Sequence, residues 1–166
     1  METRPLLNIE LTTGDKIIEI AGWCTLGFLW LFIILIYDNL PDIIPTHFNG
    51  MGQINNYGDK MTLFFLPVIC SMIFISFSVL NRYPHKYNYP VKITPENALA
   101  QYTNATRMLR FLKLTIGIIF FLVVYMVVHA IKNGNSEEIT IWMLPLVFVL
   151  IISPITYFLF KAIKLK

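Results

Sequence analysis

The chain has 166 residues, of which 56% are hydrophobic and only 14% are charged. Soluble domains carry roughly 25% charged residues, so this composition excludes an ordinary soluble domain and indicates a membrane protein. The net charge is only +3, and the basic segments are short and close to apolar runs, so we expect no nucleic-acid partner. Cys24 and Cys70 lie within apolar runs, and we expect both to be buried, packed thiols.

Four apolar runs are long enough to cross a bilayer, which takes about 20 helical residues. They cover residues 17–37, 61–80, 111–131 and 139–160. Internal prolines predict kinks in the second and fourth spans, at Pro67, Pro145 and Pro154. The sequence therefore predicts an all-α integral membrane protein, a four-transmembrane-helix bundle that forms one domain over residues 1–166.

The predicted orientation follows from the basic residues, which favour the cytoplasmic side of a membrane. Lysines and arginines gather before the first span, between the second and third spans, and after the fourth. The opposite side holds only Lys60 and Lys132, together with the acidic residues Asp38, Asp42, Asp59, Glu137 and Glu138. We therefore expect both termini in the cytoplasm, in a bacterial cytoplasmic (inner) membrane.

The outer loop, residues 38–60, carries the signals of an ordered segment. Pro41 and Pro45 restrict the backbone and favour a stiff, extended start. Asn49 and Gly50 predict a tight turn, and Asp59 is placed to cap the second span. The loop is therefore a candidate recognition surface.

His47 has two interpretations. His129 is expected near the outer end of the third span, so the two imidazoles, with the loop carboxylates, are a candidate zinc site. Neither histidine has the H-x-x-x-H or C-x-x-C spacing of a metal motif. The alternative is that His47 bonds to loop backbone and that His129 lies at the membrane interface, with no cofactor bound.

The outer loop also resembles a known family. Leu40-Pro41, Ile44-Pro45-Thr46-His47-Phe48-Asn49, Gly52, Gly58 and Lys60 resemble the hallmark of a bacterial membrane domain of unknown function. That domain forms the N-terminal half of Sdp-type immunity proteins, which protect bacilli from their own sporulation-delaying toxin. The immunity proteins carry further membrane helices beyond the four spans of this chain.

The resemblance implies a non-enzymatic protein of the immunity-like class that recognises a toxin peptide or a lipid. The expected recognition residues are Pro41, Pro45, His47, Phe48, Asn49, Gly52 and Lys60. The alternatives are a small structural subunit or homo-oligomer of a membrane assembly and a metal-binding sensor or enzyme at the outer face.

The inner segment, residues 81–110, predicts an amphipathic helix that continues into the third span. Thr94, Pro95 and Glu96 favour a helix start. The apolar positions expected on one face are Ala98, Tyr102, Ala105, Leu109 and Leu112, with Gln101, Asn104, Arg107 and Arg110 on the other. This helix would cover lipid headgroups or, as the alternative, dock a cytoplasmic regulator.

The interiors of the four predicted spans contain no charged side chain. Glu19 and Lys113 lie within a turn of the cytoplasmic end, where we expect them to snorkel to water. Ionisable residues inside a membrane usually mark ion pathways, so this pattern argues against a pump. Recognisable catalytic motifs are also missing from the sequence, and we expect no enzymatic activity.

Overall fold

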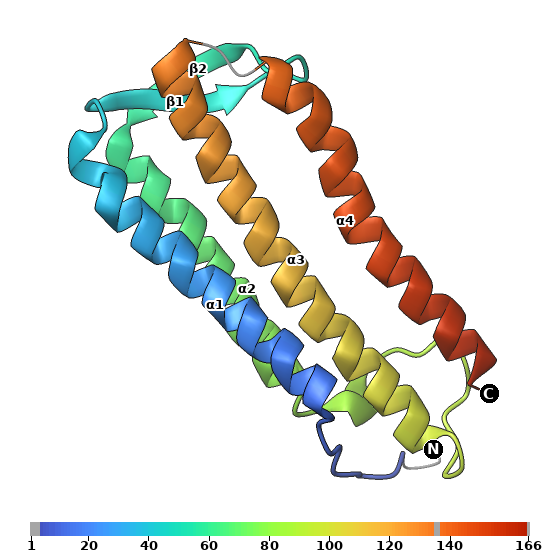
Figure 1. Ribbon diagram of the computed structural model, residues 1–166. Helices are drawn as coiled ribbons and strands as arrows, with labels where there is room; N and C mark the ends of the chain where they lie inside the picture. The colour runs from blue at the N-terminus through green and yellow to red at the C-terminus, as the bar shows by residue number, and fades with distance from the viewer. Residues whose placement is uncertain (1–3, 135–136, 166) are drawn as a thin grey trace.

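The computed structural model describes residues 4–134 and 137–165. The chain forms four long helices and one hairpin (Figure 1), namely α1 (Thr13–Ile36), β1 (Ile43–Phe48), β2 (Ile54–Asp59), α2 (Phe65–Leu80), α3 (Ala98–Asn133) and α4 (Glu137–Lys164). Short 3₁₀ turns precede β1 (Tyr37–Asn39), lead into α2 (Lys60–Phe64) and follow it (Pro84–Lys86). The described ends of the chain lie at one end of the bundle, and the hairpin lies at the other.

The four predicted spans are confirmed. Each falls within a helix that is long and apolar enough to cross a membrane. Thr12 and Asp15 form a capping box at the start of α1, in which each side chain accepts a hydrogen bond from the other's backbone N–H. Pro67 does not break the second span, because it lies in the first turn of α2, where its missing N–H removes no helical hydrogen bond. Pro145 and Pro154 do lie inside α4.

The outer loop is ordered, as predicted, but it forms an antiparallel β-hairpin rather than an irregular loop. Ile43 pairs with Asp59, and Phe48 pairs with Ile54, with irregular register between Pro45 and Phe48. The two-stranded sheet is an addition to the predicted all-helical fold. Asp59 accepts a hydrogen bond from the Met61 N–H at 2.7 Å, so it caps the 3₁₀ turn that leads into α2.

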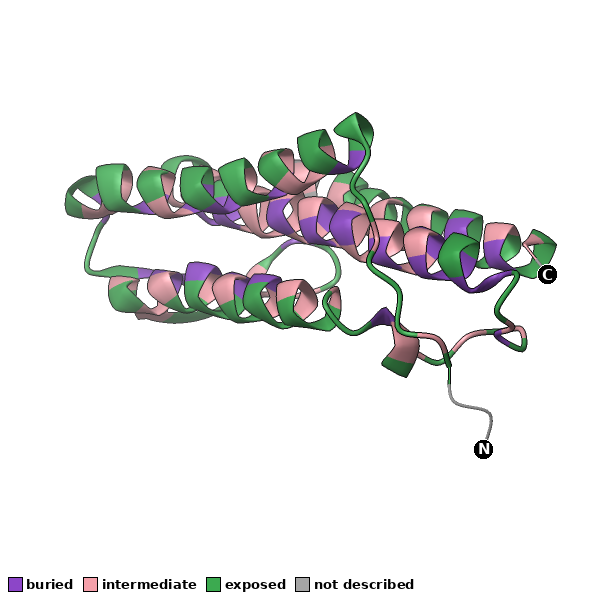
Figure 2. Ribbon diagram, turned by 90° about the horizontal axis from the view of Figure 1, so that it is seen from below, coloured by how far each residue is buried: buried purple, intermediate pink, exposed green. Residues whose placement is uncertain are grey.

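The core runs along α3, which packs against α1, α2 and α4. Figure 2 shows the buried residues on the faces that the helices turn toward one another. Ile44 of β1 and Leu63 of the 3₁₀ turn belong to the same hydrophobic cluster as Leu29, Phe74 and Val127. The hairpin is therefore packed onto the helix ends and is part of the folded core.

Two sequence expectations about residues 81–110 are wrong. Polar side chains on the first turns of α3 are buried, including Gln101, Asn104 and Arg110. They face the bundle because Gln101 donates to the carbonyl oxygens of Ala162 and Leu165, both at 2.8 Å, and Asn104 donates to that of Phe158 at 2.9 Å. The helix also begins at Ala98, later than Pro95, after a reciprocal hydrogen-bond pair between Thr94 and Asn97.

The two cysteines differ in their surroundings. Cys70 is fully buried, as expected, whereas Cys24 is exposed on the outside of α1. The sequence could not separate them, because an apolar run in a membrane helix contains both core-facing and lipid-facing positions.

Candidate functional site

The hairpin covers a pocket of about 350 Å³ at its end of the bundle. One wall is β1 and the residues that follow it, and it includes His47, Phe48 and Asn49. The other walls come from the start of α2 and from α3 and α4, with Leu66, Val127 and Leu144 among the lining side chains. Of the predicted recognition residues, Pro45, His47, Phe48 and Asn49 therefore line one edge of an apolar pocket that four separate segments build together.

His47 is exposed on β1. Its Nδ1 atom lies 2.6 Å from Oδ1 of Asn55 across the hairpin. Since the amide oxygen can only accept, Nδ1 is the donor in this contact. The imidazole is therefore oriented by the Asn55 side chain on β2, whereas the alternative interpretation predicts a hydrogen bond to loop backbone.

Asn49 and Gly52 build the turn of the hairpin. The Oδ1 atom of Asn49 accepts hydrogen bonds from the backbone N–H groups of Met51 and Gln53, at 2.9 and 3.0 Å. Gly52 has φ = 82°, a left-handed conformation that glycine adopts without steric cost. These residues shape the site, and most of the hydrogen-bonding capacity of Asn49 is used within the turn.

Lys60, directly after β2, is paired with the residue directly before β1. Its Nζ atom forms an ion pair with Asp42 at 3.0 Å and lies 5.1 Å from the centre of the Tyr37 ring. Pro45 is buried within β1, and Pro41 is exposed before it. Lys60 and the two prolines therefore hold the backbone of the site. Of the three, only Pro45 lines the pocket.

The candidate zinc site is not assembled among the described residues. They contain no group of three or more histidine, cysteine, aspartate or glutamate side chains that could hold a metal ion. His129 lies beside Tyr125 on α3, and its buried Nδ1 atom has no hydrogen-bond partner in the described part of the chain. The side chains of Glu137 and Glu138, proposed as further ligands, lie outside the part that the structure describes.

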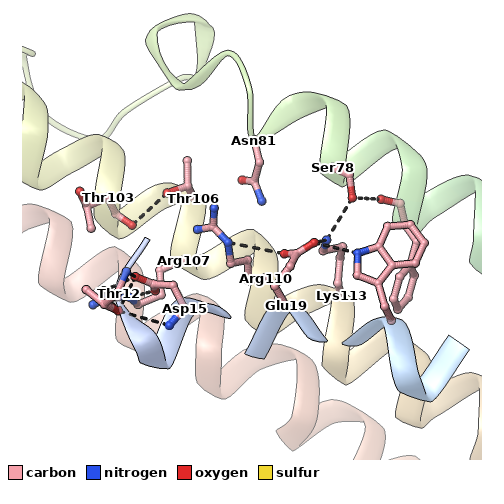
Figure 3. A network of polar contacts seen from close by, with 12 residues as sticks. Thr12, Asp15, Glu19, Ser78, Asn81, Thr103, Thr106, Arg107, Arg110 and Lys113 are labelled. Atoms are coloured by element: carbon pink, nitrogen blue, oxygen red, sulfur yellow. Dashed lines mark hydrogen bonds and ion pairs between the residues drawn. The ribbon is translucent and has the colours of Figure 1, made fainter. Parts of the chain in front are cut away.

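The opposite end of the bundle contains a charge network that the sequence analysis missed (Figure 3). Arg107 of α3 binds Asp15 of α1 through two nitrogens, Nε to Oδ1 at 2.5 Å and Nη2 to Oδ2 at 2.8 Å. Asp15 is only 2% exposed. Bidentate pairs of this kind are the strong form of an arginine–carboxylate contact.

Glu19 is the second acid of this network. Its Oε1 atom accepts hydrogen bonds from Lys113 Nζ and from Trp23 Nε1, and its Oε2 atom lies 3.5 Å from Arg110 Nε. The Lys113 amino group also donates to Ser78 of α2 at 3.0 Å and lies 5.3 Å from the centre of the Trp23 ring. Lys113 is fully buried, so the expectation that it snorkels to water is wrong.

A signal for this network was present in the sequence. Asp15, Glu19 and Trp23 repeat every four residues, and Arg107, Arg110 and Lys113 repeat every three. Each spacing places its residues on one helix face, so the two series have complementary charge on faces that can meet. The network ties α1, α2 and α3 together at this end, with three cations facing two carboxylates.

The N-terminal segment closes the same end of the molecule. Arg4 donates to the backbone oxygens of His85 and Tyr87, at 3.1 and 2.5 Å, and its guanidinium group stacks over the Tyr89 ring. Burial raises the pKa of the Tyr87 hydroxyl to about 12 and also raises the pKa of Tyr89.

These features define a small multi-pass membrane protein with four spanning helices and a hairpin at one end. Residues 24–70 match the family described as Domain of unknown function (DUF1648). The matched stretch runs from the middle of α1 through the hairpin into α2, so it contains the hairpin's whole contribution to the pocket. The chain is also 27% identical over 156 residues to an uncharacterized protein of Archaeoglobus fulgidus, which covers 86% of this chain and 81% of the archaeal one. No solved structure matches.

Proposed function

We propose that the protein is a non-enzymatic membrane protein that recognises a membrane-active peptide at the hairpin pocket, in the manner of the immunity-like class. The observation that carries the proposal is the pocket of about 350 Å³ in which His47 and Phe48 meet apolar side chains of α2, α3 and α4. Ligand sites are typically concave and mostly apolar, with a few placed polar groups that set orientation.

A peptide suits this site for two reasons. The pocket accepts an apolar side chain, and the hairpin beside it has outer edges whose backbone groups can pair with an extended chain. His47 supplies an oriented imidazole at the border between the two. Recognition of a toxin peptide at this place would give resistance by keeping the toxin from the bilayer.

Ligand-induced stabilisation tests the proposal. The purified protein would be heated in detergent with a panel of membrane-active peptides, with Zn²⁺ and a neutral phospholipid as comparison probes. A ligand stabilises the folded state by RT ln(1 + [L]/Kd), so a peptide that binds raises the melting temperature. We expect one peptide class to do so in the wild type and not in His47→Ala.

The matched control is Tyr57→Ala, because Tyr57 is 58% exposed on the same hairpin but does not line the pocket. It should keep the peptide effect. An equal effect in His47→Ala and the wild type would exclude His47 from recognition. A shift with Zn²⁺ alone would favour the metal-sensor alternative.

A structural role in a larger assembly is the second candidate. The observation in its favour is the exposure of α4, of which only 6% of the most apolar stretch is buried, against 33% for α3. Purification of the protein with a stoichiometric partner, and no peptide effect, would support it.

A further inference from the structure

Three adjoining hollows surround Tyr157 at the end of the bundle away from the hairpin. One is a groove of about 620 Å³ along the outer side of α4, from Phe148 to Lys164. A second, of about 480 Å³, lies between α3 and α4 beside Phe111 and Pro154. The third, of about 500 Å³, lies where the start of α1 meets α3 and α4. Tyr157 lines all three, so the hollows adjoin one another at one side chain.

The first two hollows, the outer groove on α4 and the groove between α3 and α4, are apolar over most of their length. The outer one is lined by exposed large side chains, including Phe148, Ile152 and Phe160. It follows α4 for about 24 Å, at 1.5 Å per residue. One leaflet supplies about 15 Å of hydrocarbon, so the groove is long enough for an acyl chain.

The third hollow supplies a basic end to both grooves. Lys161 lines it and also the outer groove, and Lys164 lies at the end of that groove. Asp15 also lines the third hollow, but its carboxylate is neutralised by Arg107 through two contacts. Among the described residues, neither Lys161 nor Lys164 has an ion pair, so the hollow keeps uncompensated positive charge.

We propose that this region binds one anionic two-chain phospholipid. Its acyl chains occupy the two grooves on either side of Tyr157, and its phosphate contacts Lys161 and Lys164. Two features distinguish this site from ordinary contact between a helix and bulk lipid. The two lysines supply positive charge, and the third hollow, which Lys161 lines, shares Tyr157 with both apolar grooves. Basic pockets between transmembrane helices bind anionic headgroups in this way.

The site is separate from the hairpin pocket, because α4 contributes to each at opposite ends of the helix (Figure 1). It also gives the exposed flank of α4 an occupant that does not require a second protein. A test of lipid binding can therefore fail or succeed independently of the peptide proposal.

Binding of phosphatidylglycerol to the whole protein in neutral detergent tests the site, with phosphatidylcholine as the neutral comparison. The dissociation constant would be measured by native mass spectrometry and by lipid-induced thermal stabilisation. We expect preferential binding of phosphatidylglycerol. Lys161→Gln should weaken it about fivefold and Lys161→Gln/Lys164→Gln about 25-fold, since a basic residue near an anionic lipid contributes roughly 1 kcal/mol.

The matched control is Lys16→Gln/Lys132→Gln, which removes the same charge at two exposed lysines outside the hollows. It should leave phosphatidylglycerol binding unchanged. Equal loss in both double variants would reduce the effect to overall charge and overturn the site. Equal binding of both lipids would do the same, as would equal stabilisation by glycerol phosphate alone, which would indicate a soluble phosphate ligand. Dimers that persist without lipid and exclude it would assign the flank to a second copy.

Discussion

At the scale of single residues, Lys113 has an unusual environment for a lysine. Its amino group is fully buried and is compensated by Glu19, with Ser78 and the Trp23 ring as further partners. Removing one partner of a buried ion pair leaves an uncompensated charge and typically costs 3–5 kcal/mol, whereas replacing both partners is far less damaging. Glu19 is 25% exposed, so we expect the free-energy cost of removing it to lie at the lower end of that range.

We therefore expect Glu19→Gln to lower the free energy of unfolding by about 3 kcal/mol. The double variant Glu19→Gln/Lys113→Met should recover part of that loss, because the fully buried ammonium group is then gone and only Arg110 still lacks its carboxylate. Chemical denaturation in detergent micelles measures both values. Glu10→Gln is the control, since Glu10 is exposed outside the network. Equal destabilisation by the single and double variants would contradict a role for the ion pair.

The sequence predicts part of the hairpin site. It identifies His47, Phe48 and Asn49 as recognition residues, and the structure brings all three to one pocket. It could not separate their tasks, because the partners of Asn49 lie in its own turn and the partner of His47 lies on the opposite strand. The charge network depends on longer-range contacts, since its pairs between α1 and α3 join residues more than 90 positions apart, and helical spacing alone does not show which faces meet.

At the scale of elements, the approach of α3 to α1 depends on Gly117. A Cβ atom at this position would lie 3.2 Å from Thr25 Cβ and 3.3 Å from Phe74 Cζ, closer than ordinary van der Waals contact. Small residues permit such close packing between membrane helices. Gly27 on α1 offers the opposite case, because an added Cβ there meets nothing within 4 Å.

Gly117→Ala should therefore lower the free energy of unfolding by about 1–3 kcal/mol through overpacking. Gly27→Ala should leave it unchanged or raise it by up to about 1 kcal/mol, because alanine favours a helix more than glycine does. Thermal unfolding of the two variants side by side measures the difference. If both changes gave the same result, the helix contact at Gly117 would not limit the packing.

The hairpin contains a comparable contact. A Cβ atom at Gly58 would lie 3.0 Å from Thr46 Cγ2 on the facing strand, whereas Gly50 has open space. Gly58→Ala should lower stability by about 1 kcal/mol and reduce any peptide binding at the pocket. The second change Thr46→Ser removes Cγ2 and should restore both properties. Gly50→Ala serves as the control, and a failure of Thr46→Ser to restore stability would place the strain elsewhere.

The four spans were predictable and the hairpin was not. Apolar length alone identifies a membrane helix, because a bilayer requires about 20 such residues and every helix satisfies its own backbone. The hairpin strands lack this kind of signal. β1 contains Pro45, β2 is largely polar and exposed, and the register is irregular between Pro45 and Phe48. Packing of Ile44 and Leu63 onto the helix ends, which the local sequence does not reveal, holds them in place.

At the scale of the whole molecule, the hairpin and the described chain ends lie at opposite ends of the bundle. The distribution of lysine and arginine predicts that the chain ends face the cytoplasm and the hairpin faces outward. This prediction concerns the orientation in the membrane, which the arrangement of the helices alone does not determine.

Cysteine labelling in intact cells measures the orientation. In a background of Cys24→Ser and Cys70→Ser, we expect a membrane-impermeant maleimide to label Asn56→Cys on β2 and not Leu7→Cys before α1. Both positions are exposed, so accessibility within the protein is matched. Permeabilised cells should show labelling of both. The reverse pattern in intact cells would invert the topology and place the hairpin in the cytoplasm.

The single unbroken helix α3 has a mechanical consequence. It is about 54 Å long at 1.5 Å per residue, and its close contact with α1 at Gly117 lies about 29 Å from its first residue and about 24 Å from its last. A stiff rod that rocks about such a point moves its two ends by similar amounts in opposite directions. Any tilt imposed beside the hairpin would therefore move the first residues of α3 by a similar distance, and Arg107, about 15 Å from the same point, by a smaller one.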